Sequence, residues 1–431
     1  MKSHGSSEKA SSAAVLGGAR VAERLRFRRR LLVLLALIAL LIVVAVGALL
    51  WRAADRDRHA SEEVAAATVL AAIDWDTRLP AFATRVTFRS FGAHLQPTVV
   101  SGVVLRPYER GGGAGAGTGA GTPGTPRGLV VIAPGTLGMA DRCASSIAIK
   151  YEAPPTPPTE ELLAAGYAVA IVDYEGLSTP GVHPYLNRLS AGHSMLDMTR
   201  VAQQIFSTEY GEALPTVLFG YSQGAGASLA AAELVETYAP ELKPTLAGVY
   251  AGAVPADLVA TAGHITDSAL SGLIGYVIES VAVSYPETQL ELEANLTDAG
   301  WDFVAGTAEE CIGDTVARWP HLGEEQRRFV TGDRRFADLL SDGSAPTLLQ
   351  VLEQQKLGQS TPAMPLFITH NAADDVLPVA PTRELVAAYQ AQGADVIYRE
   401  VDVSLGDASH GLAYTQTWDE AFAWVKDRLE G

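Results

Sequence analysis

Apolar runs of strand length alternate with stretches of helical periodicity along most of the chain. The predicted strands are residues 85–90, 98–105, 128–133, 167–172, 216–219, 246–250, 365–369 and 396–401. Strands that alternate with helices usually form a parallel sheet whose two faces are both covered. The pattern therefore predicts an α/β fold with a mostly parallel sheet and helices on both faces.

No strand is predicted between residues 251 and 363, where the periodicity of apolar residues is helical. The clearest helical stretches there are residues 270–283, 289–296 and 336–355. We interpret 251–363 as a helical cap or lid inserted into a core made of 81–250 and 364–431. A set of ordinary peripheral helices is the alternative. A cap would exclude water from a site below it and supply an apolar pocket, which suits a substrate with an acyl chain.

An apolar run without any charge extends from Leu31 to Leu50, which is long enough to cross a bilayer as a helix. Arginine is frequent directly before it, and such a basic tail stays in the cytoplasm. We expect a cytoplasmic basic tail at 1–30, a transmembrane signal anchor at 31–51 and a juxtamembrane segment at 52–80, with everything after residue 51 outside the cytoplasm. Secretion after cleavage of a signal peptide is the alternative.

Net charge and cysteine content indicate which ligands the protein is not expected to bind and whether it forms a disulfide. The formal net charge is −17, and the first thirty residues carry +6, so the remaining chain carries −23. A domain this acidic is not expected to bind nucleic acid or an anionic lipid surface electrostatically. Both cysteines, Cys143 and Cys311, lie in the exported part, which favours a disulfide between them over two unpaired thiols. No CxxC motif or His/Cys cluster indicates a metal site.

Ser222 is the candidate nucleophile. It lies in Gly220-Tyr221-Ser222-Gln223-Gly224, between the predicted strand at 216–219 and an alanine-rich helical stretch. A strand, a sharp turn and a helix form the nucleophile elbow of α/β-hydrolases, and the flanking glycines give close approach to neighbouring chain. A glycine-rich turn without function is the alternative, because this chain is rich in glycine.

Asp374 and His410 are the candidate acid and base. They follow Ser222 in the order that α/β-hydrolases use. Asp374 lies in the polar turn just past a buried-type strand, and its neighbour Asp375 cannot be separated from it by composition. His410 is expected in a loop between the last strand and a helix at 418–429. A serine hydroxyl needs a neutral imidazole to take its proton and a carboxylate to orient that imidazole. The other histidines weighed, which we expect to be structural or on the surface, are His183, His193, His264, His321 and His370.

An oxyanion hole requires two backbone N–H donors. One donor is expected from Gln223, directly after the serine, and the other from the loop that follows the strand at 128–133. Thr136 is our choice in that loop, with Leu137 as the neighbour that could replace it.

Several motifs resemble those of the secretory lipases, the family of the fungal lipase A type and of many actinobacterial exported lipases. The resemblance covers most of residues 81–431. Its motifs are Pro134-Gly135-Thr136 with Gly138, Asp141, Cys143-Ala144 and Ser146; Asp173-Tyr174-Glu175-Gly176-Leu177 with Thr179-Pro180-Gly181 and His183-Pro184-Tyr185; the elbow around Ser222; and Asp374 with Val376 and Pro378. The resemblance favours Asp374 over Asp375 as the acid.

The resemblance implies an α/β-hydrolase fold with a helical cap, which hydrolyses carboxylic esters such as acylglycerols through an acyl-enzyme and without a cofactor. The chain departs from the family's usual motifs at Asn371, where glycine is common, and at Ser145, where proline is frequent. A protein with a membrane anchor would also differ from the freely secreted members of the family. The alternatives are an acyltransferase that uses the same acyl-enzyme and a catalytically silent envelope module that binds without reacting. The sequence does not identify protein partners.

Overall fold

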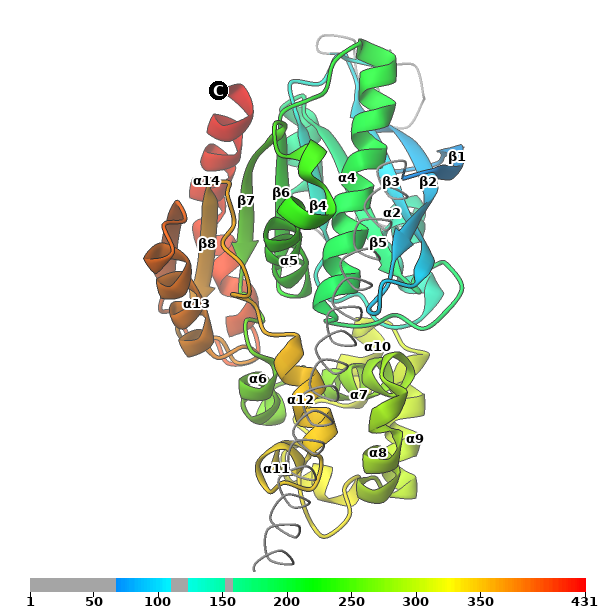
Figure 1. Ribbon diagram of the computed structural model, residues 1–431, viewed down its shortest axis with the longest axis vertical. Helices are drawn as coiled ribbons and strands as arrows, with labels where there is room; N and C mark the ends of the chain where they lie inside the picture. The colour runs from blue at the N-terminus through cyan, green and yellow to red at the C-terminus, as the bar shows by residue number, and fades with distance from the viewer. Residues whose placement is uncertain (1–66, 110–122, 152–157) are drawn as a thin grey trace, which may run out of the picture. The chain divides into compact units, whose positions relative to one another are not determined.

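The structure, a computed structural model, describes residues 67–109, 123–151 and 158–431 (Figure 1). This part of the chain forms a nine-stranded sheet in the order β1-β2-β3-β5-β4-β6-β7-β8-β9. The strands are β1 (Val69–Trp75), β2 (Ala81–Phe91), β3 (Pro97–Pro107), β4 (Leu129–Ala133), β5 (Ala168–Glu175), β6 (Thr216–Tyr221), β7 (Leu246–Gly252), β8 (Leu366–Asn371) and β9 (Val396–Val401).

The sheet is mixed, and its larger part is parallel. Strands β4 to β9 pair in parallel, whereas β1, β2 and β3 form an antiparallel edge that joins β5. Every residue of β4 is buried, as expected for a central strand that is covered on both faces. The prediction of a mostly parallel sheet is therefore confirmed, and each predicted strand overlaps an observed one.

Strand β1 was not predicted. It lies within residues 52–80, which the sequence pattern assigned to a juxtamembrane segment, and it pairs with β2 along its length. Five of its seven side chains are exposed. An edge strand with so little burial has no clear alternation of polar and apolar residues, which is why the pattern did not reveal it.

Helices cover both faces of the sheet. Helices α2, α3 and α14 share a core with alternate residues of the strands, such as Val130 and Phe219. Helices α4 and α5 pack against each other, and α13 joins them through a hydrogen bond from Tyr389 to Glu233. The bounds are α2 (Ser145–Tyr151), α3 (Thr159–Ala164), α4 (Arg188–Tyr210), α5 (Gln223–Tyr238), α13 (Val379–Ala391) and α14 (Ser409–Glu430), with short 3-10 turns η1 (Asp141–Cys143) and η2 (Pro240–Leu242).

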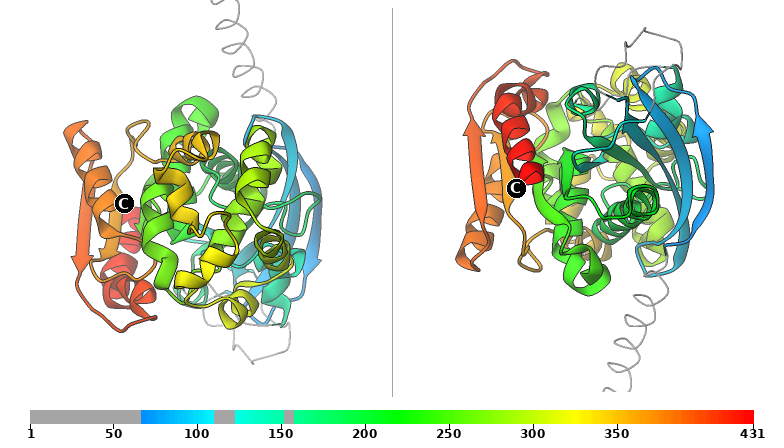
Figure 2. Two further views of the ribbon diagram at one scale, coloured as in Figure 1. Left: turned by 90° about the horizontal axis from the view of Figure 1, so that it is seen from below. Right: turned by 90° about the horizontal axis from the view of Figure 1, so that it is seen from above.

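The chain between β7 and β8 is helical, and its helices gather where the parallel strands end (Figures 1 and 2). They have an apolar core of their own, centred on residues such as Tyr276 and Phe303. The predicted helix at 336–355 is two helices, because the chain turns at Gly343 and restarts at Pro346. The bounds are α6 (Leu258–His264), α7 (Leu273–Ser284), α8 (Gln289–Asn295), α9 (Asp298–Ala308), α10 (Ile312–Arg318), α11 (Phe336–Ser341) and α12 (Pro346–Gln354), with η3 (Ile265–Asp267), η4 (Pro286–Thr288) and η5 (Gly323–Arg328).

Within the described ranges, no helix has both the length and the apolar composition needed to cross a bilayer. The predicted tail at 1–30 and the predicted anchor at 31–51 lie outside these ranges.

Candidate active site

Ser222 lies in a strained turn between β6 and α5. Its φ and ψ angles are 56° and −123°, a conformation that a non-glycine residue adopts only when its surroundings impose it. Its N–H donates to the carbonyl of Gly252 at 2.8 Å. A Cβ atom at Gly224 would stand 2.0 Å from the carbonyl oxygen of Ala133, so only glycine allows β4 to approach the start of α5 this closely. The local sequence therefore presents the serine at the carboxyl edge of the sheet.

A chain of hydrogen bonds links Ser222 to His410 and His410 to Asp374. The hydroxyl of Ser222 lies 3.0 Å from Nε2 of His410, and Nδ1 of His410 lies 2.8 Å from Oδ2 of Asp374. His410 is in the first turn of α14 rather than in a loop, because that helix begins at Ser409 and not near residue 418. The first turns of this helix were not predicted, because the apolar periodicity of the sequence is weak there.

The Asp374 carboxylate is buried but well supplied with hydrogen-bond donors. Its Oδ1 accepts the N–H groups of Val376 and Leu377, each at 2.8 Å. Burial opposes the charge, but the nearby His410 and these hydrogen bonds outweigh it, so the pKa of Asp374 lies below its usual value. The group is therefore a stable anion beside the imidazole.

The neighbouring Asp375 makes a different contact with the same histidine. Its Oδ1 accepts the backbone N–H of His410 at 2.8 Å, and its Oδ2 accepts from the hydroxyl of Ser268. Of the two aspartates that composition could not separate, Asp374 contacts the imidazole ring and Asp375 contacts the main chain.

The remaining histidines have other partners. His264 contacts the carbonyl of Asp374, His321 forms a 3.2 Å ion pair with Asp407, and His370 contacts the carbonyl of Leu377. His193 is buried beside Tyr238. His183, in contrast, lies 2.8 Å from the side chain of Gln223, a contact that sequence reasoning missed. The only local signal was its place in the His183-Pro184-Tyr185 motif.

Gln223 and Thr136, the two candidate oxyanion residues, belong to two separate segments, the start of α5 and the loop after β4. Gln223 is the first residue of α5, and the first N–H groups of a helix have no partner within it. The Thr136 hydroxyl lies 2.7 Å from the hydroxyl of Tyr185, and Tyr185 lines the same pocket as Ser222. The alternative, Leu137, packs instead against the two cysteines, and its carbonyl accepts from Ile312.

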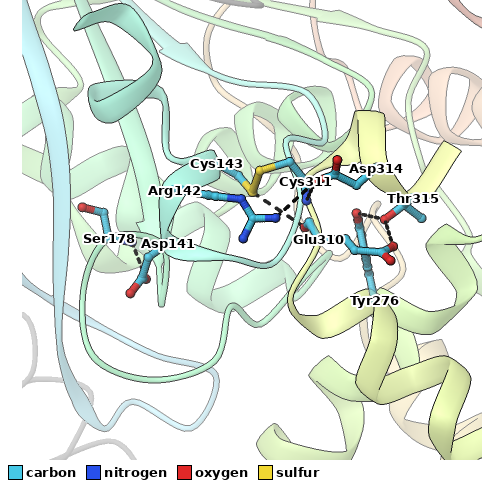
Figure 3. Close-up of a disulfide and its surroundings, with 9 residues drawn as sticks. All are labelled: Asp141, Arg142, Cys143, Ser178, Tyr276, Glu310, Cys311, Asp314 and Thr315. Carbon is cyan, nitrogen blue, oxygen red and sulfur yellow. Dashed lines mark hydrogen bonds and ion pairs between the residues drawn. A yellow bond between two sulfur atoms is a disulfide. The ribbon is translucent and has the colours of Figure 1, made fainter. Parts of the chain in front are cut away.

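Cys143 and Cys311 form the predicted disulfide, with their Cα atoms 5.5 Å apart (Figure 3). The bond joins the loop after β4 to the start of α10. A backbone bridge between Gly138 and Cys311 and a hydrogen bond from Met139 to the carbonyl of Glu310 reinforce the connection. The loop that carries Thr136 is thus fastened to the helical segment between β7 and β8.

An apolar pocket opens beside Ser222. Its empty volume, including the space at its mouth, is about 850 Å³. Apart from Ser222, its walls are almost entirely hydrocarbon, and the hydroxyl of Thr261 is already donated to the carbonyl of Asp257. The lining comes mainly from α6, α7, α8, α11 and α12, with Tyr185, Leu186, Pro255, Leu296, Val376 and Leu377.

The described residues hold no group of three or more His, Cys, Asp or Glu side chains that could bind a metal ion.

Known lipases and esterases are similar to this chain in sequence and in fold. The profile of the secretory lipase family matches residues 146–431. A Mycobacterium tuberculosis protein named a probable inactive lipase is 27% identical over 360 residues, which cover 82% of this chain and 74% of that protein. A secreted triacylglycerol lipase of Malassezia globosa is 26% identical over 299 residues, which cover 67% of this chain and only 60% of the lipase.

Two solved structures share the fold. Candida antarctica lipase A in its closed state has a TM-score of 0.68 at 19% identity, and the match covers 85% of this chain and 82% of that one. The rice cell wall degrading esterase LipA from Xanthomonas oryzae has a TM-score of 0.65 at 18% identity, and the match covers 84% of this chain and 98% of that one. Both likenesses support the α/β-hydrolase architecture.

Proposed function

This chain belongs to the secretory lipase family, and we propose that it hydrolyses carboxylic esters with Ser222 as nucleophile, His410 as general base and Asp374 as the residue that orients His410. The observation that carries the proposal is the continuous hydrogen-bond chain from Ser222 through His410 to Asp374, starting on a strained turn. A domain that only bound a ligand would have no use for a serine strained in this way.

The reaction follows from the positions of these groups. His410 takes the proton of Ser222 as its oxygen attacks the ester carbonyl carbon, and Asp374 stabilises the imidazolium that results. The backbone N–H groups of Gln223 and Thr136 donate hydrogen bonds to the carbonyl oxygen, which becomes negatively charged. His410 then gives its proton to the leaving alcohol, which departs and leaves an acyl-enzyme. His410 then deprotonates a water molecule, which attacks the acyl carbon. The bond between this carbon and the Ser222 oxygen breaks, the acid leaves, and His410 returns the proton to Ser222.

The pocket supports an acyl chain as the substrate's acid part. It is lined by hydrocarbon and offers almost no polar group for a charged or hydroxylated chain. We therefore propose a lipid or another hydrophobic ester as substrate, with residues 251–363 as a cap over the core of 81–250 and 364–431. The helices of this segment supply most of the pocket wall, which is what a cap over an acyl site requires.

We further propose that the domain works outside the cytoplasm. The disulfide suits an oxidising compartment, and the Malassezia relatives are named as secreted. The apolar run at 31–50 supports a membrane anchor, with a freely secreted form as the alternative.

Hydrolysis of p-nitrophenyl esters of short and long acyl chains by the full chain, purified in a mild detergent, tests the proposal. We expect turnover that Ser222→Ala and His410→Ala reduce by at least about 10³-fold. Labelling with a fluorophosphonate probe, which reacts only with an activated serine, is the second measurement. Folded protein without turnover or labelling would contradict the proposal and favour a silent binding module, a test that matters because one relative is named as inactive. Product analysis with an added alcohol separates hydrolysis from acyl transfer.

A further inference from the structure

We propose that His183 and Tyr185, which stand two residues apart on the loop between β5 and α4, position the two sides of the oxyanion hole. His183 holds Gln223, and Tyr185 holds Thr136. The inference rests on the proposed function, because Gln223 and Thr136 are oxyanion donors only if Ser222 attacks an ester. Neither His183 nor Tyr185 needs to contact the substrate's reacting atoms, so both act as positioning residues.

The protonation state of His183 fixes the direction of its hydrogen bonds. Burial lowers its pKa to about 4, so the ring is neutral at neutral pH. Its Nδ1 lies 2.9 Å from the carbonyl oxygen of Glu175, which can only accept, so the ring proton is on Nδ1. Nε2 is therefore an acceptor, and the side-chain amide of Gln223, 2.8 Å away, donates to it.

This contact fastens the residue whose backbone N–H is proposed to meet the oxyanion. Because Gln223 follows Ser222 directly, a side chain held at its far end restricts rotation of the peptide group between the two residues. The His183 ring also stacks on Tyr174, with centroids 5.5 Å apart, and the Tyr174 hydroxyl donates to the carbonyl of Pro134 at 2.7 Å. Pro134 precedes Gly135 and Thr136 in the chain. The stacked rings of His183 and Tyr174 are therefore also connected to the loop that carries the second proposed oxyanion donor.

Tyr185 acts on Thr136 directly. The two hydroxyl oxygens lie 2.7 Å apart, and burial raises the pKa of the Tyr185 phenol, which therefore stays protonated and able to donate. The ring packs edge-on against Tyr276 with centroids 5.5 Å apart, so its hydroxyl cannot easily move. We infer that Tyr185 holds Thr136 at a fixed distance from the elbow.

The loop that carries both residues is closely packed at one end and capped at the other. Gly176 has a φ of 74°, and a Cβ there would stand 2.5 Å from Val182 and from the backbone nitrogen of His183. Asn187 ends the loop and caps α4 by accepting the N–H of Ser190. Two side chains on one short, fixed loop therefore set the separation of the two donors. Donors must lie within a few tenths of an ångström of their optimal distance, and a misplacement of about 1 Å can cost about 10²-fold in rate.

The chain offers a matched control for each variant. Tyr276 is a second buried tyrosine whose hydroxyl contacts a threonine, Thr315, at 2.6 Å. His193 is a second buried histidine with a pKa of about 4 that stacks on a tyrosine, here Tyr238. Neither control residue has a hydrogen bond to Gln223 or Thr136 in the described structure. Tyr276→Phe keeps the ring that packs against Tyr185 and removes only the hydroxyl, so each control measures the general effect of losing such a group.

The experiment compares Tyr185→Phe with Tyr276→Phe and His183→Phe with His193→Phe in the full chain. We expect kcat to fall by about 10- to 100-fold in Tyr185→Phe and His183→Phe while KM changes less than threefold, because the donors act on the transition state. The inhibition constant of an aliphatic trifluoromethyl ketone, which binds as an oxyanion, should rise by a similar factor. His183→Gln, whose side-chain oxygen can accept from Gln223, should recover part of the loss.

Equal losses in the variants and their controls, or a change in KM alone, would overturn the positioning roles. If His183→Phe does not fold, Tyr185→Phe and His183→Gln still decide the matter. Active wild-type protein with unaffected variants overturns only this inference, whereas wild-type protein without turnover overturns the proposed function and this inference with it.

Discussion

Asp375 accepts the backbone N–H of His410 at 2.8 Å, while the carboxylate beside it holds the imidazole of the same residue. Two consecutive aspartates thus fix the main chain and the side chain of one histidine. Asp375 also contacts Ser268, so this arrangement joins the catalytic candidate to the helical segment between β7 and β8.

Substitutions at these two aspartates should differ sharply in effect. In Asp374→Asn the amide oxygen should stay with the backbone N–H groups of Val376 and Leu377, so that the NH2 group faces Nδ1 of His410. This favours the wrong tautomer of the imidazole, and we expect kcat to fall by about 10³- to 10⁴-fold. Asp375→Asn keeps an oxygen that can accept the backbone N–H of His410, so a loss below about tenfold is expected. Steady-state hydrolysis of one p-nitrophenyl ester measures both. The reverse order would identify Asp375 as the triad acid.

The disulfide should contribute strongly to stability. It joins residues with a sequence separation of 168, and the chain-entropy model assigns about 5 kcal/mol to the closure of so long a loop. The double variant Cys143→Ser, Cys311→Ser should lower the free energy of unfolding by about this amount in urea titrations. The control is Arg142→Ala, which removes an exposed ion pair to Asp314 close to the disulfide and should cost less than about 1 kcal/mol. Equal losses in both proteins would contradict the prediction.

Gly224 should not tolerate a methyl group. The added Cβ would meet the backbone of Ala133 at 2.0 Å, and backbone cannot move aside cheaply. We expect Gly224→Ala to lose more than about 2 kcal/mol of stability and most of its activity, since Ala133 leads into the loop of Thr136. Gly313→Ala is the control for this substitution. Gly313 lies in helix α10, and no atom lies within 4 Å of a Cβ added there. This control substitution should stabilise the protein by about 0.5–1 kcal/mol, as thermal unfolding would record.

Stability should depend on pH through His183. Its pKa is about 4 in the folded protein and near 6.5 when unfolded. Between these values the unfolded chain binds the extra proton, so the free energy of unfolding falls as pH drops through this window. The expected loss from pH 7 to pH 5 is about 2 kcal/mol. His183→Gln cannot titrate, so its loss over the same range should be smaller by that amount. Parallel urea titrations at both pH values give the comparison, and identical pH dependence would refute it.

Filling the apolar pocket should shorten the preferred acyl chain. Val277 lines the pocket from α7, and Val277→Phe adds bulk where an acyl chain would lie. We expect kcat/KM for long-chain esters to fall at least tenfold, with butyrate hydrolysis nearly unchanged. Val283→Phe, at a half-exposed position of the same helix outside the pocket, is the control. A uniform decrease for all chain lengths would argue against this site for the acyl group.

The elements that have a regular pattern of apolar residues or a recognisable motif could be predicted from the sequence. The buried strands β4 to β8 and the turn at Ser222 have strong local signals, and the two cysteines left one possible pairing. Strand β1 and the first turns of α14 were missed, because exposed edges and mixed helical faces show little periodicity.

Contacts between distant segments were harder to predict. His183 meets Gln223 across 40 residues, and Tyr185 meets Thr136 across 49. Both pairs depend on how β4, β5 and β6 are ordered in the sheet, since this order brings the three loops to one edge. No spacing within a single segment contains that information. The choice between Asp374 and Asp375 likewise depends on where α14 places His410.

The bond between Cys143 and Cys311 also limits how the helical segment can move. Because Cys311 is covalently held to the loop of Thr136 and bridged to it through Gly138, this point of the segment cannot lift away from the sheet. Any displacement of helices that widens the pocket mouth must therefore occur away from Cys311, in the parts of the segment that this bond does not hold. Thr136, the proposed oxyanion donor, belongs to the loop that is held in this way, so its position should not depend on how far the pocket mouth widens.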